Sequence, residues 1–174
     1  VMNILYFDCF SGISGDMTIG ALLDLGVDFG KLQTELEKLC LDKEYRITFE
    51  KRIKNNIQAT KFDVITERHH HKERTYNNIR TLIETSKLGS SIQELSLKIF
   101  DRIAEAESKI HGINKDEVHF HEIGAIDSII DIVGTSFCIH ELKPDRIIAS
   151  PLPLTRGSIE TEHGVWPLPA PATL

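Results

Sequence analysis

Two stretches of alternating apolar and polar residues, 45–52 and 57–66, lie on either side of the sequence Lys54-Asn55-Asn56. Alternation with a period of two is typical of a strand that has one face on a core. The pattern therefore predicts an antiparallel hairpin.

Short strands are also indicated at 3–8 and 146–149. Helices are indicated by the spacing of apolar residues at 16–25, 31–39, 76–85, 92–109 and 126–142. The order of strand, helices, two strands, helices and strand resembles a split βαβ arrangement with expanded helical connections. We therefore expect an α+β core domain with a mixed sheet over residues 1–149. The Pro- and Gly-rich stretch 150–174 is expected to form a site loop that leads into a missing C-terminal region.

The composition excludes several classes of function. A chain of 174 residues can bury a core without disulfides. Its 20 basic and 26 acidic residues give a net charge of -6. This balance argues against binding to a nucleic-acid backbone and against a polybasic patch that would bind a membrane. Cys9, Cys40 and Cys138 lack the spacing of a thiolate zinc site. With no export signal and no apolar run near the ~20 residues of a membrane span, we expect a reducing cytoplasm.

Metal-capable side chains are dense between residues 117 and 131. His119 and His121 are two residues apart, so both imidazoles would leave one face of an extended segment. Asp127 and Asp131 are four apart, so both carboxylates would share a face of the predicted helix. Together with Glu122 they suit a borderline divalent cation such as nickel, zinc, cobalt or manganese. The alternative is a solvated loop, because the spacing matches no standard zinc motif.

A turn of small residues at 9–15 joins the first strand to the next helix. Its glycines let the backbone approach a ligand, and the helix start presents free N–H groups, as a phosphate site does. The candidate phosphate contacts are Ser11, Gly12, Ser14 and Gly15. The turn is neither a P-loop nor a dinucleotide fingerprint, and it could simply be capped by Ser14 or Asp16. Asp16 also disfavours an adjacent anion unless a cation lies between them.

Two further stretches carry histidine. In 155–164, Arg156 could bind a small anion and His163 could act as a ligand or as an acid or base, while a plain hairpin is the alternative. The run His69, His70 and His71 cannot place all its imidazoles on one strand face. In a flexible loop such a run would bind divalent ions only loosely. It is therefore interpreted either as a solvated loop or as an auxiliary segment that delivers a divalent ion to a tighter site.

Three long motifs, in this order, closely resemble those of the nickel insertases that mature the nickel-pincer cofactor of lactate racemase. They are Y-F-D-C-F-S-G-I-S-G-D-M, V-H-F-H-E-I-G-A-I-D-S-I-I-D-I-V-G and S-P-L-P-L-T-R-G-S-I-E-T-E-H-G-V-W-P-L-P-A-P-A-T. The resemblance implies insertion of Ni²⁺ into pyridinium-3,5-bisthiocarboxylic acid mononucleotide, a cyclometallase reaction of the lyase or chelatase class. It also implies CTP with Mg²⁺ or Mn²⁺ and a C-terminal domain associated with CTP binding. Whether residues 1–174 are active alone stays open.

Forming a nickel–carbon bond releases a ring proton, so the resemblance implies a base in the pocket. Asp16, His121 and His163 are the candidate catalytic groups. Two other functions stay open, a metal-dependent phosphohydrolase and a nickel storage or delivery module without catalysis. A homo-oligomer also stays open.

Overall fold

The computed structural model describes residues 2–41, 43–66, 74–120, 126–154, 156–161 and 164–169. The helices are α1 (Gly15–Asp24), α2 (Phe29–Glu37), α3 (Tyr76–Thr85), α4 (Ser90–His111) and α5 (Ile126–Leu142), with a 3-10 turn at Lys115–Glu117. The strands are β1 (Ile4–Phe7), β2 (Tyr45–Lys54), β3 (Ile57–Thr66), β4 (Arg74–Thr75), β5 (His119–Phe120), β6 (Arg146–Ala149), β7 (Gly157–Thr161) and β8 (Gly164–Leu168). The α+β class is confirmed.

The described strands form four separate two-stranded sheets, so the expected single mixed sheet is not seen there. β1 and β6 are parallel, whereas β2–β3, β4–β5 and β7–β8 are antiparallel. The hairpin β2–β3 packs on helix α1 instead of joining β1. This approach is close, because a Cβ added to Gly20 of α1 would lie 2.6 Å from the carbonyl oxygen of Thr60.

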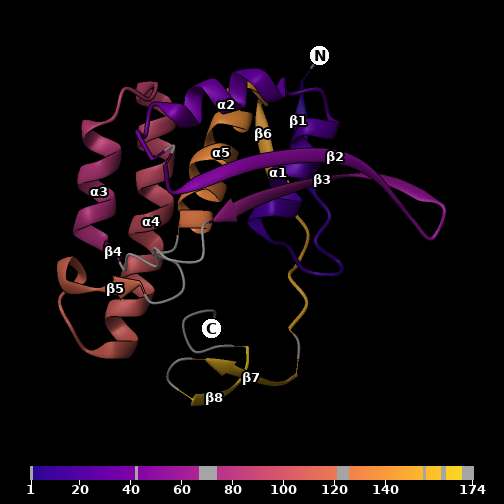
Figure 1. Cartoon of the computed structure of the whole chain (residues 1–174). Helices are drawn as coiled ribbons and strands as arrows, with labels where there is room; N and C mark the ends of the chain where they lie inside the picture. Colours follow the sequence, from indigo (N-terminus) through magenta and orange to yellow (C-terminus); the bar gives the residue numbers. More distant parts are fainter. Residues whose placement is uncertain are drawn as a thin grey trace.

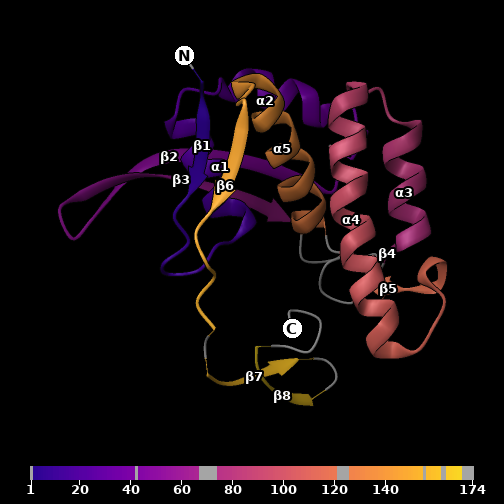
Figure 2. The same ribbon diagram turned by 180° about the vertical axis from the view of Figure 1, so that it is seen from behind.

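Helix α5 lies at the centre of the helical layer, between α1 and α4 (Figures 1 and 2). Its apolar residues recur every three or four positions, the spacing that turns one face of a helix toward a core. Ile129, Ile130 and Val133 are fully buried, as are Ile19 of α1 and Phe100 of α4. The core therefore runs across the helices, and the predicted bounds of 126–142 for this helix are confirmed.

The predicted hairpin is confirmed, and Asn55 and Asn56 form its turn with φ values of 51° and 62°. The stretch 150–174, expected to be a loop, contains the hairpin β7–β8 instead, which was the alternative for 155–164. Figure 1 shows β7 and β8 at the end of an extended segment, away from the helices. None of the described helices is long and apolar enough to cross a membrane.

Candidate functional site

The Gly/Ser turn begins at the carboxyl end of the parallel pair β1–β6, the edge at which open α/β sheets bind ligands. The backbone N–H of Ser150 donates to the carbonyl of Phe7 at 2.9 Å. The N–H of Cys9 donates to Ser150 Oγ at 2.8 Å. The backbone N–H of Gly12 donates to the carbonyl of Cys9 at 2.9 Å and closes the turn. The φ of Gly12 is 91°, a value that favours glycine. The turn and the chain that leaves β6 are thus held side by side.

Helix α1 begins directly against α5. A Cβ at Gly15 would overlap the carboxyl group of Asp131, and a Cβ at Gly134 would lie 2.8 Å from Ile19 Cδ1. Gly15 and Ile19 lie about one turn apart on α1, and Asp131 and Gly134 lie about one turn apart on α5. The two contacts are therefore neighbours along one seam between the helices, the α1–α5 junction. Close packing at this seam therefore brings the Gly/Ser turn next to a predicted metal ligand.

The start of α1 is capped from outside the helix. Ser14 occupies the N-cap position, but its side chain does not accept from the helix N–H groups. Its hydroxyl instead donates to the Asp16 carboxylate. The backbone N–H of Asp16 donates to the carboxylate of Asp131. One of the N–H groups expected to face a phosphate is thus already bonded to an anion of the chain itself.

The Asp131 carboxyl group is in an unfavourable environment for a negative charge. Burial, followed by the charges of Asp16 and Asp127, raises its pKa from 3.8 to about 7, while the hydrogen bond from the Asp16 N–H lowers it. Its Oδ1 atom is buried and has no hydrogen-bond partner among the described residues. A buried acceptor without a partner costs free energy, so a proton or a cation at this position would stabilise the fold.

Asp127 differs from Asp131 although both lie on α5. It is exposed in the first turn of the helix, where its Oδ1 accepts from the N–H of Ser128 at 2.8 Å. Its charge contributes to the raised pKa of Asp131. Within the described ranges, no group of three or more His, Cys, Asp or Glu side chains is placed to hold a metal ion. The described carboxylates therefore do not form a complete metal site by themselves.

The histidine half of the predicted metal cluster is described only at His119. This residue lies on β5 opposite Thr75, and its side chain is exposed, whereas that of Phe120 is buried. Six predicted site residues fall outside the described ranges: His69, His70, His71, His121, Glu122 and His163. Arg156 is exposed and precedes β7, which both views place away from α1 (Figure 2).

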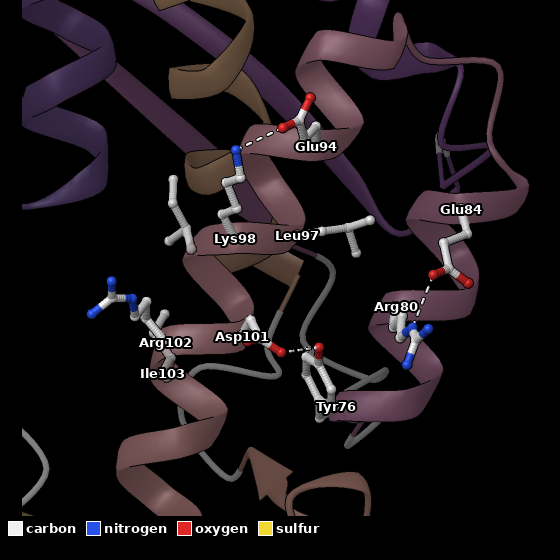
Figure 3. A pocket seen from close by; sticks show the side chains of 10 residues that line it. Tyr76, Arg80, Glu84, Glu94, Leu97, Lys98, Asp101, Arg102 and Ile103 are labelled. Carbon is white, nitrogen blue, oxygen red and sulfur yellow. Dashed lines mark hydrogen bonds and ion pairs between the residues drawn. The ribbon is translucent and has the colours of Figure 1, made fainter.

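A separate hollow of about 790 Å³ lies between α3 and α4 (Figure 3). Four of its charged groups form two ion pairs, Arg80 with Glu84 at 2.8 Å and Lys98 with Glu94 at 2.6 Å. Tyr76 donates to Asp101 at 2.7 Å, and burial, followed by that carboxylate, raises the pKa of Tyr76 to about 12. No sequence-predicted site residue is among the described residues that line this hollow.

Two residues that shape this region, Gly134 and Ser150, were not predicted from the sequence. Gly134 lets Ile19 approach α5, and its signal was available as a glycine three positions after Asp131 on the predicted helix. Ser150 ties the ends of β1 and β6 together through two hydrogen bonds. A serine before a proline gives no such signal, because its partners lie more than a hundred residues away in sequence.

Comparisons with known proteins identify the family of the chain. Residues 5–174 match the family described as nickel insertion protein. The proteins named pyridinium-3,5-bisthiocarboxylic acid mononucleotide nickel insertion protein from Geobacillus kaustophilus and Clostridium kluyveri are 50% and 48% identical, over 99% of this chain. The chain spans 44% and 46% of their respective lengths. No solved structure matches it. The chain belongs to the nickel insertion protein family.

Proposed function

We propose that this chain is the nickel-handling part of an enzyme that inserts Ni²⁺ into pyridinium-3,5-bisthiocarboxylic acid mononucleotide to form the nickel-pincer cofactor of lactate racemase. The names of its relatives supply the substrate. The observation that supports a specific nickel site is the buried Oδ1 of Asp131. This atom has no hydrogen-bond partner among the described residues and lies beside the Gly/Ser turn.

Nickel would be held by nitrogen and oxygen donors. The proposed ligands are His119, His121, Glu122, Asp127 and Asp131. A site of several thiolates would retain nickel against the sulfur atoms of the substrate, whereas imidazole and carboxylate ligands exchange more readily. A cation beside Asp131 would offset both its burial and the repulsion from Asp16 and Asp127.

The anionic substrate would bind at the start of α1. Ser11, Gly12, Ser14 and Gly15 are proposed to contact its phosphate, with Arg156 as a further partner. Because three carboxylates lie near this helix start, nickel between the carboxylates and the substrate would remove the repulsion. Nickel replaces one ring hydrogen, and Asp16, His121 and His163 are the proposed acceptors of that proton.

The remaining parts of the proposal concern the whole enzyme. The run His69 to His71 would collect nickel, and residues 150–174 would lead from the core into a C-terminal domain. That domain would use CTP with Mg²⁺ or Mn²⁺, and the reaction would be of the lyase or chelatase class. A reducing cytoplasm is the proposed location, because the relatives' substrate carries reactive thiocarboxylates.

The test uses the full-length enzyme with Ni²⁺, the bisthiocarboxylate mononucleotide and CTP with Mg²⁺. We expect the absorbance of the substrate to change and the product to activate apo lactate racemase. An unchanged spectrum without racemase activation would contradict the proposal. Phosphate release without CTP would indicate a phosphohydrolase, and tight nickel binding without product would indicate a storage module.

Two variants separate the proposed nickel sites. Replacing His119 and His121 with alanine should remove tight nickel binding, because two imidazole ligands are lost. Replacing His69, His70 and His71 with alanine should lower the number of bound nickel ions but leave insertion largely intact. If the second variant lost all insertion and the first retained it, the two assignments would be reversed.

A further inference from the structure

The hairpin β2–β3 continues well past the helix that supports it (Figures 1 and 2). Asp24, the last residue of α1, accepts hydrogen bonds from Lys51 and from Thr60, the latter at 2.7 Å. All residues from 50 to 59 are exposed. We call residues 50–59 the distal arm, because the described helices leave all of them exposed.

The distal arm exposes apolar side chains that a solvated turn does not need. Alternate residues of β2 from Tyr45 through Ile47 and Phe49 point to the same face as the fully buried Phe62. Ile53 continues this stripe toward the tip of the hairpin, beyond helix α1, and is 74% exposed. Ile57, beside the turn, lies on the opposite face of the hairpin and is 71% exposed. Exposed apolar side chains gathered on one projection are typical of an interaction surface.

The arm is held in a defined shape. Asn55 and Asn56 both have the left-handed backbone of a tight two-residue hairpin turn, and the strands stay paired to the last residue before it. Such preorganisation lowers the entropy cost of binding. The same rigidity keeps the tip from folding back onto helix α1, so the tip stays available to an added surface.

Charge indicates the nature of that molecule. The distal arm contains three basic residues and one acidic residue, a net charge of +2, while the whole chain carries -6 and the rest of it therefore -8. Lys51 and Arg52 pair with acidic side chains, but Lys54 makes no ion pair among the described residues. A second copy of this chain offers an acidic body to each basic arm, so one pair of copies satisfies both arms at once.

We propose that two copies of this chain form a symmetric dimer in which the distal arm of each packs its tip against the acidic body of the other. Contact is through the face and tip of the arm. Edge-to-edge sheet pairing is disfavoured, because the lysine and arginine side chains of residues 51–54 would crowd an added strand.

Sedimentation equilibrium of the chain over about a hundredfold range of concentration tests the dimer. We expect monomer to convert to dimer as concentration rises. Replacing Ile53→Ser and Ile57→Ser together should weaken the dimer about tenfold or more. Ile65→Ser is the matched control, since this exposed isoleucine lies on the same ribbon at its body end, and it should leave the dimer intact. Lys54→Glu should also weaken the dimer and reduce its sensitivity to salt.

Both isoleucines of the double variant are exposed, so its circular dichroism and melting temperature should match the wild type and exclude misfolding. Carbodiimide cross-linking of mixed ¹⁴N and ¹⁵N chains should join Lys54 to a carboxylate of the other isotope. A chain that stays monomeric throughout would overturn the proposal. So would a double variant that dimerises as the wild type does, or cross-links of Lys54 confined to one chain.

Discussion

The α1–α5 junction and the distal arm depart from ordinary folding rules in opposite directions. The junction buries an acceptor, Asp131 Oδ1, without a partner in the described part of the chain. The arm exposes two apolar side chains, Ile53 at 74% and Ile57 at 71%. Buried polar groups and clustered exposed apolar groups are both costly, and neither contributes to the stability of this chain by itself.

The difference between the two regions lies in what would relieve each cost. A small cation or a proton can satisfy one buried oxygen, whereas only a surface can cover two isoleucines on a projecting ribbon. We therefore propose a small ligand at the α1–α5 junction and a protein partner at the distal arm. Substitutions in and beside the two regions can break or sharpen this distinction.

The largest effect is expected where the hairpin β2–β3 packs on helix α1. Phe62→Ala should lower the free energy of unfolding by about 3–5 kcal/mol, because this side chain is fully buried and its loss leaves a cavity. Urea unfolding followed by circular dichroism measures the change. A loss below about 1 kcal/mol would mean that the ribbon does not pack on α1 as described.

The next effect concerns the seam between α1 and α5. Gly15→Ala should cost about 1–3 kcal/mol, because the new methyl group would overlap the Asp131 carboxyl and the helices must separate. Gly30→Ala is the control, since its Cβ would meet only a side-chain oxygen at 3.2 Å on the exposed start of α2. Equal unfolding free energies for the two variants would contradict the close contact between Gly15 and Asp131.

The third prediction has a defined pH dependence. The pKa of Asp131 is raised from 3.8 to about 7 in the fold, so the folded state binds the proton more tightly than the unfolded state. Stability is therefore lost as pH rises from about 4 to about 7. About three pKa units correspond to about 4 kcal/mol, which partial solvent contact reduces to about 1–2 kcal/mol.

Asp131→Asn should therefore stabilise the protein by about 1–2 kcal/mol at pH 8 and have little effect at pH 4. Urea unfolding at the two pH values measures this difference. Asp127→Asn serves as the control, because Asp127 is exposed, and its effect should stay within about 0.5 kcal/mol. A destabilised Asp131→Asn protein at pH 8 would show that its charge already has a partner.

The smallest effect is expected at the arm. Ile53→Ser with Ile57→Ser should change the unfolding free energy by less than about 0.5 kcal/mol at concentrations too low for dimerisation, because both side chains are exposed. Chemical denaturation of the dilute protein checks this. A large loss would place the two isoleucines in the chain's own core and remove the reason to invoke a partner.

Elements with strong local signals could be predicted from the sequence. The bounds of α3, α5 and β3 match the residues at which their patterns start and stop. At α3, the start is fixed by a capping box in which Thr75 and Asn78 bond to each other's backbone. Local chemistry of this kind does not depend on the rest of the fold.

Contacts between distant segments could not be predicted in the same way. The spacing of Asp127 and Asp131 indicated a shared helix face, but not that Gly15 would lie against one of them. Likewise the strand patterns did not show that β1 pairs with β6 while β2 and β3 pack on α1. Tertiary packing decides such contacts. The predicted roles of His121, Glu122 and His163 stay predictions, since these residues lie outside the described ranges.

The central claim is that Asp131 forms part of the nickel site. It is tested by calorimetric titration of Ni²⁺ into the chain with His69, His70 and His71 replaced by alanine, so that the histidine run does not contribute. Asp131→Asn should raise the Kd for nickel about tenfold or more at pH 7.5, while Asp116→Asn, an exposed control carboxylate, should leave it unchanged. Because Asp131→Asn should stabilise the fold at this pH, weaker binding would not reflect unfolding. Equal nickel affinity of the Asp131→Asn protein and its parent would contradict the account.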